Sequence, residues 1–176
     1  MKHTRPVCIE NPPVTTEASG DDSRKLEIKV VYTGTAATVS ALKRAHQCAQ
    51  ALGAHIDLLY WQVVPRFFDF NAPPVSIHFM QRQLCSMAQA CCPDVTVEVR
   101  MFLCRHLEES LADILSHESL VILGGKKKWW HSREEKLANA LASRGYMVLF
   151  VDSGIPNQSP WADVNGNGAR QGRHVY

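Results

Sequence analysis

The feature that most constrains this chain is a regular alternation of short apolar segments with longer segments of helical periodicity. The short segments are rich in β-branched and other apolar residues, as β-strands are. They span residues 26–32, 55–61, 96–101, 120–123 and 146–151. The segments between them repeat apolar residues every three or four positions, as amphipathic helices do. This alternation predicts an α/β fold with a single doubly wound, five-stranded parallel sheet and helices on both faces.

The hydrophobic pattern of each strand indicates its place in the sheet. Residues 96–101 alternate strictly between apolar and polar, which is typical of a half-exposed edge strand. Residues 26–32 and 120–123 are more uniformly apolar and fit the centre. Numbering the five strands along the chain, we predict the order 3-2-1-4-5.

The fifth strand does not fit an edge position in an isolated subunit. Residues 146–151 are almost wholly apolar, and a long apolar edge invites aggregation unless it is covered. The simplest cover is the same strand of a second subunit across a two-fold axis. We therefore predict a homodimer, with Tyr146, Val148 and Phe150 on the dimer strand.

Capping signals mark the ends of the predicted helices. The first helix spans residues 37–52 and is followed by Gly53, a typical residue just past a helix end. Ser76 is a candidate cap for the second helix, and the third covers 106–117. Ser132, with a glutamate three residues later, matches a capping box for the fourth helix, which a glycine ends.

Length and composition bound the rest of the interpretation. The chain has 176 residues, of which 45% are hydrophobic and 20% charged, with a net charge of +2, as in an ordinary globular protein. We predict one α/β domain over residues 25–153, between disordered tails at 1–24 and 154–176. The absence of an export signal or a long apolar run predicts a cytoplasmic protein with no membrane contact. The small net charge argues against a nucleic-acid partner.

The switch point of the predicted sheet lies between the first and fourth strands, where open α/β sheets bind ligands. Two loops meet there, and the second joins a buried strand to a capped helix, so backbone N–H groups and the helix dipole can attract an anion. The candidate cleft residues for an anion or nucleotide are Thr33, Gly34, Thr35, Gly124, Gly125, Lys126, Lys127 and Ser132.

Trp129 and Trp130 interrupt this basic loop and allow two interpretations. The indoles could stack on a base beside the lysines. Alternatively, they fill the cleft or pack at an interface, since tryptophan buries a large area. We favour the second interpretation, because the lysines of this loop supply charge but not the close backbone approach to phosphate that glycines permit.

Motifs for catalysis or metal binding are missing from the sequence. The histidines lack metal-ligand spacing, and neither a Walker A sequence nor a nucleophile elbow is present. The six cysteines form no C-x-x-C pair, so we expect reduced thiols, with a redox role for Cys91 and Cys92 as a less favoured alternative. We predict no enzymatic activity, no metal and no cofactor, with ATP or another nucleotide as the alternative ligand.

Four parts of the chain together resemble the universal stress protein family. Val30-Val-Tyr-Thr-Gly-Thr35 is similar to its first strand and turn, and residues 41–60 to its first helix and second strand. Residues 107–125, ending in Ser-Leu-Val-Ile-Leu-Gly-Gly, are similar to its third helix and fourth strand, and 137–151 to its last helix and strand. The resemblance implies a Rossmann-like fold of the adenine nucleotide alpha hydrolase type, with order 3-2-1-4-5 and dimers through the fifth strand.

The resemblance also shows a departure at the nucleotide loop. Members that bind ATP have an aspartate after the first strand and a Gly-x-x-Gly-x9-Gly-Ser/Thr motif after the fourth. Here the aspartate position holds Thr33, and Gly125 matches the first glycine. The second glycine falls on Lys128, and the final pair falls on Ala138-Asn139 or, counted back from the fifth strand, on Glu134-Glu135.

Both alignments lose the later glycines and the hydroxyl, so we predict a regulatory or stress-response module that is not a standard ATP binder. One alternative is a nucleotide- or phosphate-binding member with a divergent Gly-Gly-Lys-Lys-Lys loop and slow ATP hydrolysis. A third, weaker hypothesis is a basic and aromatic module that binds RNA or a small anion.

Overall fold

The computed structural model describes residues 4–7, 26–71, 73–126 and 132–154. Its strands are β1 (Thr4–Val7), β2 (Glu27–Val31), β3 (His55–Val63), β4 (Val97–Cys104), β5 (Leu120–Gly125) and β6 (Met147–Asp152). Its helices are α1 (Thr35–Leu52), α2 (Ile77–Cys91), α3 (Leu107–Ile114) and α4 (Arg133–Ser143). None of the helices within these residues is long and apolar enough to cross a membrane.

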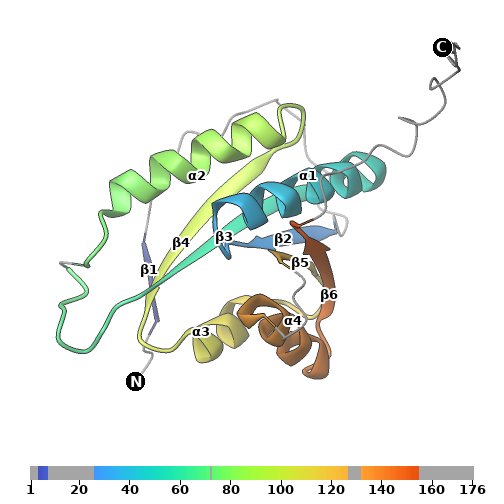
Figure 1. Ribbon diagram of the computed structural model, residues 1–176. Coiled ribbons are helices and arrows are strands. Elements are labelled where there is room, and N and C mark those ends of the chain that lie inside the picture. Colours follow the sequence, from blue (N-terminus) through green and yellow to red (C-terminus); the bar gives the residue numbers. More distant parts are fainter. Residues whose placement is uncertain (1–3, 8–25, 72, 127–131, 155–176) are drawn as a thin grey trace, which may run out of the picture.

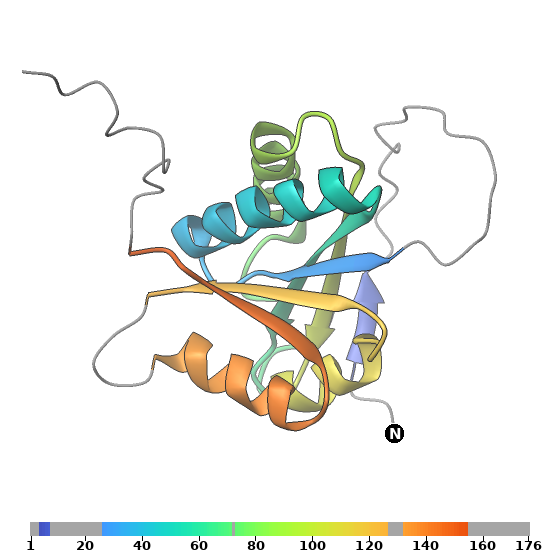
Figure 2. The ribbon, with the colours of Figure 1, turned by 90° about the vertical axis from the view of Figure 1, so that its right-hand side faces the viewer.

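The strands form one sheet in the order β1-β4-β3-β2-β5-β6 (Figure 1). The five strands from β4 to β6 are parallel, which confirms the predicted order 3-2-1-4-5. Helices α1 and α2 cover one face, and α3 and α4 cover the other (Figure 2). The doubly wound architecture predicted from the alternation of strands and helices is therefore confirmed.

The N-terminal strand β1 corrects two predictions. Residues 1–24 were expected to be a disordered tail, but Thr4–Val7 pair antiparallel with the end of β4. Strand β4 is therefore not the edge along this part, and it continues to Cys104 instead of ending at Met101. Sequence reasoning missed β1 because Pro6 lies within it, and proline is uncommon in strands. A proline is tolerated in an edge strand whose nitrogen faces away from the neighbouring strand.

The predicted caps are confirmed at both serines. The Ser76 hydroxyl accepts a hydrogen bond from the Phe79 N–H at 3.4 Å, and the Ser132 hydroxyl accepts one from the Glu135 N–H at 3.1 Å. Gly53 adopts the left-handed conformation expected after a helix. Helix α3 is shorter than predicted, because the chain becomes extended at Leu115 to bury that side chain.

Each face of the sheet has its own hydrophobic core. Ile28, Val30, Ile56 and Leu58 belong to the cluster that includes buried residues of α1 and α2. The alternate residues of the same strands, such as Val31 and Leu59, pack with buried residues of α3 and α4. This alternation follows from the strand period of two, and each fully buried aliphatic side chain contributes about 1.5–3 kcal/mol.

A row of charged side chains lies near the start of the strands, on the face of the sheet that α3 and α4 cover. Asp57 is fully buried, and neither of its carboxylate oxygens has a hydrogen-bond partner. The Arg100 Nη1 lies 3.6 Å from Asp57 Oδ2, but Arg100 also donates two hydrogen bonds to Glu98. Lys29 pairs with Glu27 at 3.1 Å. Burial raises the pKa of Asp57, and the Arg100 charge opposes this only in part.

Candidate functional site

The loops after β2 and β5 meet as predicted, but they are tied to each other. The Thr33 hydroxyl donates a 2.6 Å hydrogen bond to the Gly124 carbonyl. The Thr33 N–H donates to the hydroxyl of Thr38, which is fully buried in α1. At this position the resemblance implied a ligand-binding aspartate, and the threonine instead joins β2, α1 and β5.

The two glycines that end β5 are required by packing. A Cβ on Gly124 would lie 1.9 Å from the carbonyl oxygen of Ala37, so only glycine lets α1 approach β5 this closely. A Cβ on Gly125 would lie 2.7 Å from the Phe150 ring and 2.9 Å from the Glu134 Cβ. The glycine signal in the sequence is therefore explained by contacts with helices and β6, whether or not a ligand binds.

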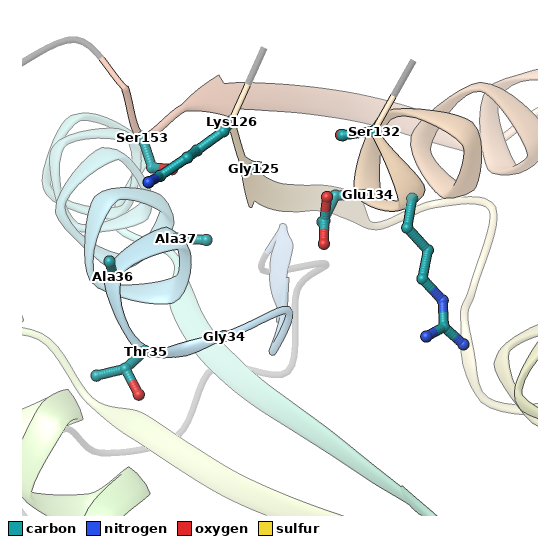
Figure 3. A pocket seen from close by; sticks show the side chains of 10 residues that line it. Gly34, Thr35, Ala36, Ala37, Gly125, Lys126, Ser132, Glu134 and Ser153 are labelled. Carbon is teal, nitrogen blue, oxygen red and sulfur yellow. The ribbon is translucent and has the colours of Figure 1, made fainter. Parts of the chain in front are cut away.

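An open pocket of about 620 Å³ lies between the N-termini of α1 and α4 (Figure 3). Its lining residues are Gly34, Thr35, Ala36, Ala37, Gly125, Lys126, Ser132, Arg133, Glu134 and Ser153. Gly34, at φ 143°, precedes α1 and gives the helix no side-chain cap. The first N–H groups of a helix have no acceptor within it, and no acidic residue lies in the first turn of α1. This side of the pocket can receive an anion.

The opposite side of the same pocket is electrostatically different. Glu134 and Glu135 occupy the first turn of α4, and the Glu134 carboxylate lies at the pocket (Figure 3). Ser132 already uses its hydroxyl to cap this helix. Lys126 extends across the pocket toward Ser153, away from Glu134. The positive end of the α4 dipole is therefore offset by the helix's own carboxylates.

A second pocket, of about 900 Å³, lies at the ends of β2 and β3 beside α3 and α4. Its lining includes Tyr32, Tyr60 and Trp61. The Tyr32 and Tyr60 rings meet edge to face, and Trp61 donates a 2.8 Å hydrogen bond to Ser110. Burial raises the pKa of the Tyr60 hydroxyl. Sequence reasoning missed this pocket, although aromatic residues at the ends of two neighbouring strands were a visible signal.

Arg105, also at the second pocket, holds the loop after β3 in place. Its guanidinium donates to the carbonyls of Val64 and Pro65, and to that of Phe68 at 3.1 Å. It also lies 4.2 Å from the centre of the Phe70 ring. These contacts use donors of the guanidinium on the loop backbone, so Arg105 shapes the pocket by fixing this loop.

The structure divides the predicted site residues between the two pockets and the contact of β5 with α1. Gly34, Thr35, Gly125, Lys126 and Ser132 line the first pocket. Thr33 lines the second, and Gly124 is buried against α1. Lys127, Trp129 and Trp130 lie outside the described residues. The two interpretations of the tryptophan pair therefore both remain predictions.

The predicted dimer strand requires one correction. Tyr146 lies before β6, not in it, and its buried ring stacks on His117 with centroids 4.2 Å apart. It is therefore a core residue and is not available to a partner. Val148 and Phe150 do lie in β6, and both are half-buried.

Cys91, Cys92 and Cys104 are free thiols. Burial raises the pKa of all three, and that of Cys92 reaches about 12. A raised pKa leaves little thiolate at neutral pH, which disfavours a redox-reactive pair at Cys91 and Cys92. Within the same residues, His, Cys, Asp and Glu side chains form no group suited to a metal ion.

The sequence matches no family model and no curated protein. Among solved structures, the chain is similar to a universal stress protein crystallised in complex with cAMP. The match has 18% identity and a TM-score of 0.47, and it covers 74% of this chain and 99% of that chain. At this identity the likeness concerns the fold alone, and the fold assignment rests on the strand order and helix positions described above.

Proposed function

We propose that the protein is a non-catalytic regulatory module of the universal-stress-protein type that does not bind ATP in the standard manner of that family. The observation that carries the proposal is the position of Glu134. Its carboxylate lines the pocket at the N-terminus of α4, where the resemblance implies phosphate would bind. A phosphate there would meet a negative charge instead of an uncapped helix end.

The packing of the neighbouring residues supports the same proposal. Thr33 uses its hydroxyl on the Gly124 carbonyl, and Gly124 is enclosed by α1. A nucleotide would therefore lack both the acidic contact for its ribose or base and the flexible glycines around its phosphates.

Homodimerisation through β6 is the second part of the proposal. In the described part of the chain, no strand pairs with the outer edge of β6. Its apolar residues Val148, Leu149, Phe150 and Val151 are only half-buried in the single subunit. Pairing with a second β6 would satisfy the backbone and bury the rest of these side chains.

Isothermal titration of the full chain with Mg-ATP tests the proposed loss of nucleotide binding. We expect a dissociation constant weaker than about 1 mM, which corresponds to about −4 kcal/mol. Glu134→Gln should strengthen binding of ATP or inorganic phosphate about five- to tenfold by removing the opposing charge. Glu118→Gln is the matched control, because Glu118 is exposed and lines neither pocket. Micromolar affinity in the wild type, unchanged by Glu134→Gln, would contradict the proposal.

The alternative function is nucleotide binding in a divergent pose. The observation that favours it is that the two pockets adjoin and share Arg133 and Glu134. A base could lie in the aromatic second pocket while a phosphate reached the N-terminus of α1 and Lys126. In that case Lys126→Ala should weaken binding, whereas Lys43→Ala, on the exposed side of α1, should not.

A further inference from the structure

Within the part of the chain that the structure describes, the outer edge of β4 is covered along half of its length. β4 has eight residues, and β1 pairs with Met101–Cys104 alone, in the register Thr4 with Cys104 to Val7 with Met101. Among the described residues, no strand pairs with this edge along residues 97–100. Unpaired N–H and C=O groups along a strand edge are a template for another strand.

β1 is a weak occupant of this edge. Pro6 has no N–H, so we assign its pair with Phe102 to a position without ladder hydrogen bonds. Because such positions alternate in an antiparallel pair, only Arg5 and Val7 exchange both bonds with β4. The strand therefore contributes two hydrogen-bonded residue pairs.

The connection to β2 is long enough for β1 to leave. Residues 8–26 separate the two strands in the sequence, and a segment of that length can span about 60 Å. In the sheet, β1 and β2 are separated by β4 and β3, which amounts to about 14 Å. Detaching β1 therefore does not require β2 to move.

The chemistry of the uncovered half identifies the strand that fits it. Continuing the register of β1 would set Glu10 opposite Glu98, and like charges opposite each other destabilise a strand pair. Three carboxylates, those of Glu98, Asp57 and Glu27, lie beside two cations, Arg100 and Lys29. Arg100 already donates hydrogen bonds to Glu98. Val99, which lies between Glu98 and Arg100 in β4, is buried. The same register would set Ile9 opposite Val99, which is already an apolar pair. A partner strand that keeps an apolar residue there and carries a basic residue opposite Glu98 would therefore complement this edge better than the chain's own sequence.

We propose that the β4 edge is a docking site for an extended peptide segment of a partner protein, which displaces β1 and pairs antiparallel with Val97–Cys104. The partner segment carries Lys or Arg opposite Glu98 and an apolar residue opposite Val99. Main-chain hydrogen bonds supply affinity and the side chains supply specificity, as in other cases of strand addition. β1 is a built-in competitor, present at an effective concentration of about a millimolar.

Fluorescence anisotropy with two labelled peptides tests the docking site. The first has the sequence of residues 4–11 with serine at the Cys8 position, and the second also carries lysine at the Glu10 position. The host is the full chain with Arg5→Pro and Val7→Pro, which removes both hydrogen-bonded pairs of β1. We expect this variant to bind at least about tenfold tighter than the wild type, because the competitor is weakened. The lysine peptide should bind about threefold tighter than the glutamate peptide, and Glu98→Lys should reverse that preference.

A disulfide lock provides the control within a single chain. Thr4 lies opposite Cys104 at a position without ladder bonds, where the Cα atoms are about 4.5 Å apart and a disulfide can form. In Thr4→Cys, oxidation should abolish peptide binding and reduction should restore it, with the bond located by mass spectrometry. Equal binding by the oxidised and reduced chains would overturn the proposal. So would absence of binding to a double-proline variant that melts as cooperatively as the wild type. A disulfide that forms between two chains would show that the edge accepts β1 of a second copy, which overturns the assignment to a different partner.

Discussion

The two edges of the sheet are protected in different ways. The β4 edge is covered along Met101–Cys104 by a short antiparallel strand from the chain's own N-terminus. The β6 edge has no such strand among the described residues, and its apolar side chains remain half-buried. An edge covered by the chain itself can be regulated by detaching that cover, whereas an apolar edge without a cover favours stable association. We therefore propose strand exchange at the β4 edge and dimerisation at the β6 edge.

The largest expected effect comes from Gly124→Ala in β5, the strand that pairs with β6. A Cβ at 1.9 Å from the Ala37 carbonyl oxygen forces α1 away from β5. We expect the free energy of unfolding to fall by about 3–5 kcal/mol, the range for severe packing defects. Hydrogen exchange should increase in β5 and β6 more than in β1 and β4.

Urea denaturation followed by circular dichroism measures this loss. Gly154→Ala is the matched control, since Gly154 is exposed and a Cβ there would meet only the Asp152 side chain, at 3.2 Å. A loss below about 1 kcal/mol for Gly124→Ala would show that α1 can shift without cost, and that β6 does not depend on this contact.

Leu149→Lys sharpens the comparison by testing the dimer edge directly. Leu149 lies near the middle of β6, so a two-fold axis would set the two lysines close together. We expect the dimer dissociation constant to rise at least about 100-fold, or about 2.7 kcal/mol, from lost burial and repulsion. Sedimentation velocity measures the change.

Two controls separate the edges in this experiment. Met147→Lys, at the exposed end of β6, should have a smaller effect. Val7→Pro, at the other edge, should leave the dimer intact. If Val7→Pro dissociates the dimer and Leu149→Lys does not, the roles assigned to the two edges are reversed.

The smallest expected effect concerns Asp57 and the pH dependence of stability. Burial raises the folded-state pKa of Asp57 above the ordinary 3.8, so the folded state binds its proton more readily than the unfolded state. The destabilising contribution of this carboxylate is complete above the folded pKa and is lost as pH falls through it. Asp57→Asn should therefore be more stable relative to the wild type at pH 7 than at pH 5.

Thermal unfolding of both proteins across this pH range isolates the contribution, because Glu98 titrates in both. Its lowered pKa, held down mainly by the hydrogen bonds from Arg100, acts in the opposite direction: that stability is lost as pH falls. A stability difference between wild type and Asp57→Asn that does not change with pH would show that Asp57 keeps an ordinary pKa.

Most of the parallel sheet could be predicted because its signals are local. Strand periodicity, the glycines at positions 53 and 145, and the caps Ser76 and Ser132 each act through neighbouring residues, and the structure agrees at each. The candidate site was predicted less completely. Its loops meet as expected, but the second pocket depends on residues from β2, β3, α3 and α4, which no sequence window contains.

The sequence by itself determined the five parallel strands, their order and the approach of the β2 and β5 loops, since hydrophobic pattern dictates which strands are central. Only the tertiary structure decided that Thr4–Val7 pair with β4, that Gly124 is required by Ala37, and that Tyr146 faces the core. These three outcomes depend on contacts between residues far apart in the chain. Contacts of that kind leave no periodic signal in the sequence, because each is set by the shape of a surface that forms only when the sheet and its helices pack together.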